Sequence, residues 1–95
     1  PTIFTRFANS QIGHLAPLVR PKVSEQFDYE GELAVIIGAS CRHVAAGDAF
    51  AQVAGYACYN DGSVRDWQRH THQFTPGKNF FATGPLGPWM VTPDE

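Results

Sequence analysis

The pattern of apolar and polar residues predicts one strand more clearly than any other element. Between Gln26 and Ile37 the chain passes from mixed polar residues into the unbroken apolar run 33–37. A short apolar run rich in β-branched side chains is typical of a strand that is buried on both faces. We therefore predict a strand over residues 26–37, whose polar end carries carboxylates and whose apolar end enters the core.

The other predicted strands are shorter. Tyr56–Asn60 is predicted to form a strand that places Asp61 at its end, and Trp89–Thr92 is predicted to form another. The segment Pro1–Ser24, which prolines and a glycine interrupt, is expected to be irregular or extended. Strands do not alternate with helices in the manner of a doubly wound sheet, so the predicted fold class is α+β and strand-dominated.

Two short helices are expected. One runs through 49–54, with Asp48 as N-cap and Gly55 just after its end. The other opens at Ser63-Val64-Arg65-Asp66, a variant of the capping box with Asp in the place of Glu or Gln. It would bring Arg65, Gln68 and His72 onto one face.

Composition indicates a single globular domain. The chain has 95 residues, 43% hydrophobic and 17% charged, and begins at Pro1, so we expect residues 1–95 to be one incomplete domain of a longer protein. No apolar run approaches the ~20 residues of a membrane span, and a net charge of −2 gives no basis for binding nucleic acid. Cys41 and Cys58 are not in a CxxC motif, which predicts buried free thiols and a cytoplasmic location.

Three carboxylates are the candidate site. Glu30 and Glu32 are two residues apart on the predicted strand, so their side chains would share one face, and Asp61 could join them from another element. Like charges held together need a cation, and oxygen ligands favour Mg²⁺ or Mn²⁺, with Ca²⁺ as a further alternative, over Zn²⁺. The competing interpretation is a solvated strand end, with Asp61 as an ordinary turn residue in Asn60-Asp61-Gly62.

Three further polar residues are candidates for contact with a substrate. Arg65 and Gln68 would bind a carboxylate or oxo group if their helix faces the acidic site, and they are ordinary exposed positions otherwise. Lys78 would stabilise an enolate, or it is a surface lysine. His70 and His72 lack the spacing of a zinc site.

The order and spacing of several motifs, which cover essentially the whole chain, resemble the catalytic domain of the fumarylacetoacetate hydrolase family. Any one of them alone would be weak, and together they are specific. The motifs are Asp28–Gly38, Gly55–Tyr56, Asn60–Gln68, Gly77–Phe80 and Gly87–Trp89.

The resemblance implies a segment of a mixed β-sandwich roll with a metal site at its mouth. It assigns Glu30, Glu32 and Asp61 to the metal, and Arg65, Gln68 and Lys78 to substrate binding, with Lys78 also catalytic. Members act on small keto acids and usually form homodimers. Arg6 stands where many members have lysine, a departure expected to have little consequence.

These implications lead to a metal-dependent hydrolase that cleaves a C–C bond in a 2-oxo or 1,3-dicarbonyl acid, such as an acylpyruvate or a fumarylacetoacetate-like compound. The group that activates water is expected to lie outside this chain. One alternative is a decarboxylase or isomerase of an oxaloacetate- or hydroxymuconate-type acid that uses the same enolate. Another is a non-catalytic module that binds a metal or ligand. No nucleic acid or membrane partner is expected.

Overall fold

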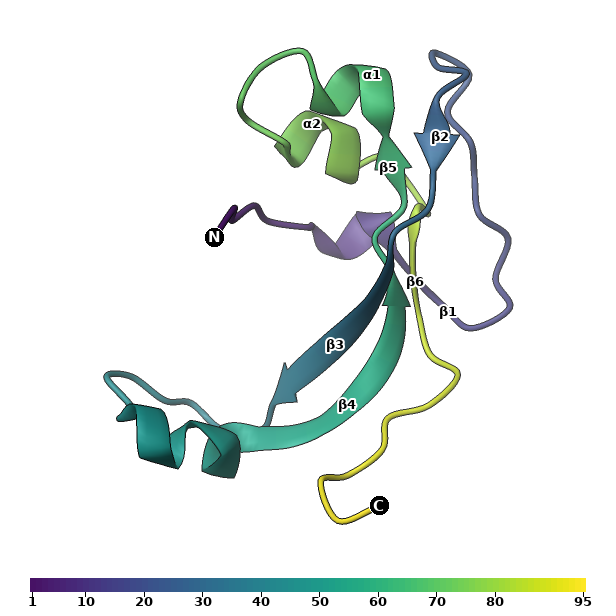
Figure 1. Cartoon of the computed structure of the whole chain (residues 1–95). Helices are drawn as coiled ribbons and strands as arrows, with labels where there is room; N and C mark the ends of the chain where they lie inside the picture. Colours follow the sequence, from purple (N-terminus) through teal and green to yellow (C-terminus); the bar gives the residue numbers. More distant parts are fainter.

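A long antiparallel ribbon of two strands organises the chain (Figure 1). A computed structural model describes all of residues 1–95, and its ribbon consists of β3 (Gly31–Ile37) and β4 (Val53–Asn60). The two strands pair from Gly31 opposite Asn60 to Ile37 opposite Val53, with a register shift between Ile36 and Ile37. This pairing places the residues just before β3 beside those just after β4.

Two further strands extend the ribbon into a four-stranded mixed sheet of order β1-β6-β4-β3. β6 (Gly84–Leu86) is antiparallel to β4, and β1 (Gln11–Gly13) is parallel to β6. A second sheet pairs β2 (Phe27–Asp28) with β5 (Ser63–Val64). The structure is therefore strand-dominated α+β, as the pattern predicts.

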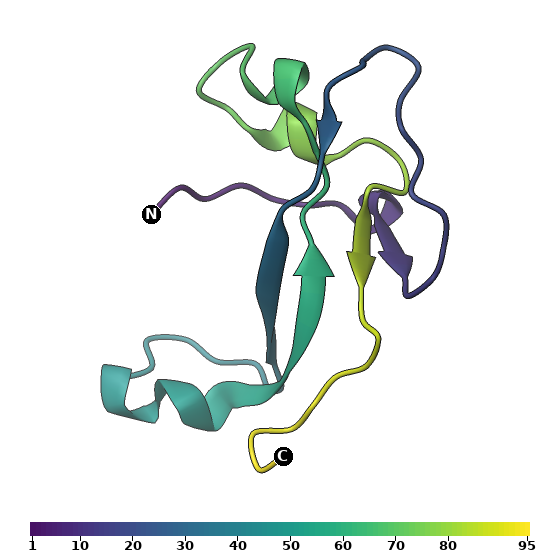
Figure 2. The ribbon, with the colours of Figure 1, turned by 45° about the vertical axis from the view of Figure 1, so that its right-hand side comes forward.

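The helical elements are short and lie at opposite ends of the ribbon (Figures 1 and 2). α1 (Arg65–Gln68) and α2 (Thr75–Lys78) pack together beside the second sheet, and η1 (Ala8–Ser10) precedes β1. The 3-10 helix η2 (Ala46–Gln52) lies at the far end, between β3 and β4. None of the helices is long and apolar enough to cross a membrane.

The strand predicted over residues 26–37 is two strands in different sheets. The chain leaves β2 at Asp28 and enters β3 at Gly31, and Glu30 lies in the crossing. There its amide donates to Asn60 Oδ1 at 3.0 Å, and its carbonyl accepts from the Asp61 amide at 2.9 Å. The backbone of Glu30 therefore has hydrogen-bond partners although no single strand continues through it. The pattern of apolar and polar side chains could not reveal this break.

Both short helices are present near the predicted positions, but the predicted capping residues were wrong. The N-cap of η2 is Ala45, Asp48 lies within its first turn, and Gly55 belongs to β4. Ser63 lies in β5 instead of capping α1, because its hydroxyl bonds to other partners, and α1 ends at Gln68, before His72. Of the predicted strand Trp89–Thr92 only an isolated bridge between Tyr56 and Val91 is present, and β6 and α2 were not predicted.

Burial also differs from the expectation for the apolar run. Leu33, Val35 and Ile37 share one face of β3 and are 69%, 51% and 56% exposed. The buried apolar residues instead lie in β4, β5 and the turn before β6, and they are Ala57, Val64 and Ala82. Both cysteines are free, as predicted, but they are exposed and not buried.

Candidate metal centre

Glu30, Glu32 and Asp61 meet where the ribbon joins the second sheet. Glu30 lies in the crossing before β3, Glu32 is the second residue of β3, and Asp61 follows β4. Since Gly31 is opposite Asn60, the ladder brings all three side chains together. One oxygen from each carboxylate lies within 4.8 Å of the others. The predicted convergence is present, although Glu30 is not in a strand.

The three carboxylates differ in their exposure to solvent. Asp61 is 1% exposed, Glu30 is half-buried and Glu32 is exposed. None of the cavities in the structure is lined by any of them. The cluster is therefore open to solvent on the side of Glu32 and closed on the side of Asp61.

Lys78 is buried within the cluster, which excludes its interpretation as a surface lysine. Its side chain is 1% exposed, and Nζ lies 2.6 Å from Asp61 Oδ2, 2.6 Å from Ser63 Oγ and 2.9 Å from Glu30 Oε1. All three ammonium protons therefore have partners. Lys78 ends α2, and a Cβ on the preceding Gly77 would lie 2.6 Å from Gln68 Cα, so glycine is needed for α2 to approach α1 closely.

Arg65 and Gln68 lie beside Glu30, at the rim of the cluster. The Arg65 guanidinium binds Asp28 through Nε and Nη2, at 2.9 and 2.8 Å, and forms an ion pair with Glu30 through Nη1. Nη1 also donates to Gln68 Oε1 at 3.0 Å. The predicted helix face does turn toward the site, but the arginine fork here binds protein carboxylates.

Arg6 is the residue that sequence reasoning undervalued. Its side chain is 7% exposed and forms an ion pair with Asp61, although the two residues are 55 positions apart. The expectation that an arginine here has little consequence does not fit a buried guanidinium in contact with a candidate ligand. The only signal in the sequence is a charged residue between Thr5 and Phe7 in an irregular segment, and it does not reveal the partner.

Glu30 and Glu32 have pKa values shifted in opposite directions. Burial works to raise the pKa of Glu30, but hydrogen bonds and charges from Lys78 and Arg65 outweigh it, and the pKa is lowered. The pKa of Glu32 is raised, first by burial and then by the negative charges of Asp61 and Glu30. Of the three carboxylates, only Glu32 forms no ion pair with a lysine or arginine.

The donor set fits a hard divalent cation. The group contains carboxylate oxygens only, without cysteine or histidine, which suits Mg²⁺, Mn²⁺ or Ca²⁺ better than Zn²⁺. Glu32 also brings a negative charge that forms no ion pair with a lysine or arginine. A bound cation would offset the repulsion from Asp61 and Glu30 that contributes to its raised pKa.

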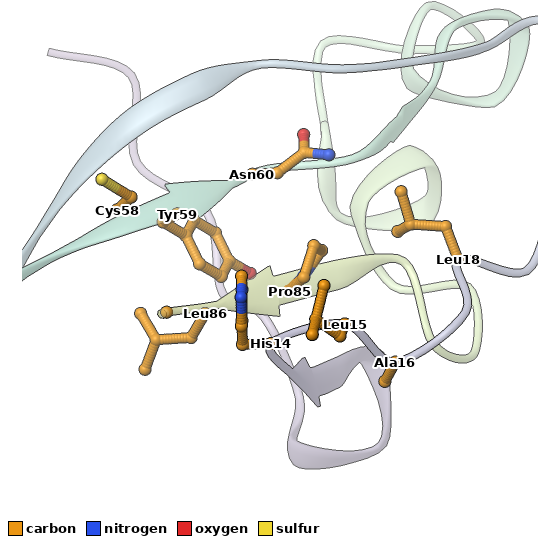
Figure 3. A pocket seen from close by; sticks show the side chains of 10 residues that line it. His14, Leu15, Ala16, Leu18, Cys58, Tyr59, Asn60, Pro85 and Leu86 are labelled. Carbon is orange, nitrogen blue, oxygen red and sulfur yellow. The ribbon is translucent and has the colours of Figure 1, made fainter. Parts of the chain in front are cut away.

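A cavity of about 290 Å³ lies against β4 and β6 (Figure 3). Its lining comes from the segment after β1, which includes His14, from the end of β4 and from β6. The three carboxylates do not line it, although Tyr59, which does, is the register partner of Glu32.

Comparison with known proteins gives one family across the whole chain. The model of the fumarylacetoacetate (FAA) hydrolase C-terminal domain matches residues 1–95. The mitochondrial oxaloacetate tautomerase FAHD2A of Homo sapiens is 46% identical over 97 residues, which span 100% of this chain and 31% of that protein. The chain thus spans about a third of the length of this relative.

Solved structures show the same fold. A fumarylacetoacetate hydrolase from Exiguobacterium antarcticum superposes with a TM-score of 0.90 and 40% identity, over 96% of this chain and 33% of that one. A 5-carboxymethyl-2-hydroxymuconate delta-isomerase from Mycobacterium smegmatis gives a TM-score of 0.85 and 39% identity, over 90% and 34%. The expectation of a segment from this family's roll is confirmed.

Proposed function

The chain belongs to the fumarylacetoacetate hydrolase family, and from this premise we propose that it is the metal-binding part of a hydrolase. The reaction is cleavage of a C–C bond in a small 2-oxo or 1,3-dicarbonyl acid, of the acylpyruvate or fumarylacetoacetate-like kind. The observation that carries the proposal is the convergence of Glu30, Glu32 and Asp61 beside a buried Lys78. Mg²⁺ or Mn²⁺ is the proposed cofactor, with Ca²⁺ as the alternative.

Glu30, Glu32 and Asp61 would hold the cation. When bound, it supplies Lewis-acid polarisation of a substrate oxygen. Asp61 offers a fixed ligand because it is buried, whereas Glu32 offers an exposed one. This difference would direct the substrate to the open side of the cluster.

Lys78 would stabilise negative charge that develops as the C–C bond breaks. In hydrolysis, the oxygen of water bonds to the carbonyl carbon, the C–C bond breaks, and its electron pair forms an enolate that is then protonated. A preorganised positive charge that water does not screen is effective at stabilising such an anion. Since its three protons face Asp61, Glu30 and Ser63, Lys78 would act through its charge unless it gives up one of these contacts.

Arg65 and Gln68 would orient the acid group of the substrate. The Arg65 side chain is 21% exposed at the rim, where Asp28, its partner, is 48% exposed. Because Asp28 is about half exposed, solvent weakens this ion pair, and a substrate carboxylate would replace Asp28 at low cost. This exchange would place the acid group next to Glu30.

An isomerase, tautomerase or decarboxylase acting through the same enolate is the second candidate. It is favoured by the names of two relatives, an oxaloacetate tautomerase and a hydroxymuconate delta-isomerase. These reactions need no water to attack the carbonyl carbon. The third candidate is a module that binds metal or ligand without turnover.

A panel of three substrates separates these candidates. The full-length protein is supplied with Mg²⁺ and an acylpyruvate, oxaloacetate or a hydroxymuconate, and the products are followed by NMR. We expect cleavage of the acylpyruvate into two acids. Isomerisation or decarboxylation without any cleavage would replace the hydrolase with the second candidate, and no turnover of any substrate would leave the third.

Metal binding is tested independently of turnover. Calorimetric titration with Mn²⁺ compares the wild type with Glu32→Gln, which removes the exposed ligand, and with Glu25→Gln, a matched control whose side chain is 88% exposed and pairs with Arg20. We expect Glu32→Gln to bind at least about tenfold more weakly and Glu25→Gln to bind as the wild type does. Equal binding by all three proteins would contradict the metal centre.

A homodimer and a cytoplasmic location remain predictions. Light scattering at several protein concentrations tests the first. The human relative is named as mitochondrial, so cell fractionation is the appropriate test of the second.

A further inference from the structure

We propose that Arg6 is a positioning residue of the metal centre, which holds Asp61 in the orientation that binds the cation. This inference rests on the proposed metal site but goes beyond it, because Arg6 is not one of the candidate ligands. The observation behind it is a guanidinium with a 7% exposed side chain whose Nη1 contacts Asp61 Oδ1.

The guanidinium of Arg6 joins three parts of the chain at once. Nη1 also donates to the Gly62 carbonyl at 3.1 Å, and Nη2 donates to Thr83 Oγ1 at 2.8 Å. The guanidinium carbon lies 5.8 Å from the centre of the Tyr59 ring, within the range of a cation–π contact. Arg6 therefore connects its own segment, through hydrogen bonds, to the turn after β4 and to the residue before β6.

The surroundings leave room for this guanidinium and little else. A Cβ on Gly84 would lie 2.7 Å from Arg6 Nη2, so a larger residue at position 84 would displace the group. Thr83, the acceptor of Nη2, is fully buried, and its amide donates to the carbonyl of buried Ser10 at 3.1 Å. The position of Arg6 is thus set by packing on more than one side.

Asp61 has a cation on each of its two oxygens. Arg6 contacts Oδ1 and Lys78 contacts Oδ2, so together they fix the rotation of the carboxylate plane. A carboxylate oxygen can accept two bonds, so each oxygen keeps one acceptor site for a metal ion. Without Arg6 only Oδ2 would be held, and Asp61 could turn away from Glu30 and Glu32.

Two effects of Arg6 on the cation oppose each other. Its positive charge repels a divalent ion, whereas its hydrogen bonds keep a buried ligand in the binding orientation. Partners that orient metal ligands typically contribute about 10- to 100-fold in affinity when they are tested by substitution. We infer that positioning outweighs repulsion, because Asp61 is 1% exposed and solvent does not replace the lost bonds.

The test measures Mn²⁺ affinity by calorimetry, and the melting temperature in EDTA, on the full-length protein. Arg6→Met is expected to bind Mn²⁺ about 10- to 100-fold more weakly than the wild type. Arg6→Lys keeps the charge and a donor, and we expect it to restore affinity to within about fivefold. Thr83→Val is the matched control, because it removes a bond of the same guanidinium but leaves the contact with Asp61.

We expect Thr83→Val to lower the melting temperature while it keeps the wild-type Mn²⁺ affinity within about twofold. If Arg6→Met lowers the melting temperature but binds Mn²⁺ as tightly as the wild type, or more tightly, the positioning role is refuted. Should Arg6→Met fail to fold, Arg6→Gln provides the same comparison with a neutral donor and is expected to bind at least about tenfold more weakly. Failure of the wild type to bind Mn²⁺ would instead refute the proposed function.

Discussion

The two ends of the β3–β4 ribbon are opposite in character. At the end next to the second sheet, most of the fully buried side chains are polar or charged, Lys78 and Asp61 among them, and Val64 is the apolar exception. Farther along β3, Leu33, Val35 and Ile37 are more than half exposed. The end next to the second sheet therefore buries charged side chains, whereas β3 exposes apolar ones.

The difference shows what holds each end in place. Charged side chains are almost never fully buried unless they are paired, and here each buried charge has an opposite charge within hydrogen-bond distance. The polar end is thus organised by a network of ion pairs. A large exposed apolar patch marks a surface that contacts another part of a protein or a partner, as the predicted homodimer would provide.

The largest effect on stability is expected from removing the buried ammonium group of Lys78. Lys78→Met should lower the free energy of unfolding by about 3 kcal/mol, because it leaves Asp61 and Glu30 facing each other with one cation fewer. Urea denaturation in EDTA measures the loss. Lys22→Met, at an exposed position, should change the stability by less than about 0.5 kcal/mol. Similar losses in the two variants would show that the network does not stabilise this end.

A smaller effect should distinguish buried from exposed valines. Val64, which is 0% exposed, is expected to cost about 2 kcal/mol when it is truncated to alanine, from lost burial and the cavity left behind. Val35→Ala, at a 51% exposed position on β3, should cost less than about 0.5 kcal/mol. Urea denaturation at two protein concentrations provides the comparison. A large, concentration-dependent cost of Val35→Ala would mean that a second copy covers this face in solution.

The smallest expected effect is a change in how the free energy of unfolding depends on pH. Since the pKa of Glu32 is raised by folding, its favourable contribution is fully present below the unfolded pKa, about 4.3, and is lost as the pH rises through the folded pKa. Without metal, Glu32→Gln should therefore be more stable than the wild type at pH 7, by less than about 0.5 kcal/mol. This gain should vanish near pH 4.

Glu30→Gln provides the opposite case. Its pKa is lowered by folding, so Glu30 stabilises the protein above the unfolded pKa and loses this contribution as the pH falls through the folded pKa. This variant should be less stable than the wild type at pH 7 and approach it in acid. Denaturation curves in EDTA at several pH values measure both variants, and a shared sign would contradict the assignment of Glu32 as the carboxylate without an ion pair.

The sequence predicted the placement of the carboxylates better than the boundaries of the strands and helices around them. The spacing of Glu30 and Glu32 predicted that their side chains share one side, because an extended chain turns residues two apart to the same side, but it left a solvated strand end as the alternative. The break between β2 and β3 was not predictable, since it depends on the side chain of Asn60, which bonds to the Glu30 amide. Ser63 was misread for a similar reason, because its hydroxyl binds Lys78, a contact that local sequence does not encode.

Burial was the least predictable property. An apolar run such as 33–37 indicates that a strand can be buried, but the covering surface comes from elsewhere. The contact between Arg6 and Asp61 was hidden because the two residues are distant in sequence, and an arginine in an irregular segment is most often exposed.

The crossing at Glu30 ties the metal centre to the pairing of the ribbon. The amide of Glu30 donates to the side chain of Asn60, and its carbonyl accepts from the amide of Asp61, so two candidate ligands are joined by a backbone hydrogen bond. A cation that binds only this folded arrangement would stabilise it by mass action. Binding of the metal and folding of this end of the ribbon would therefore be coupled, and removing the ion would lower the melting temperature.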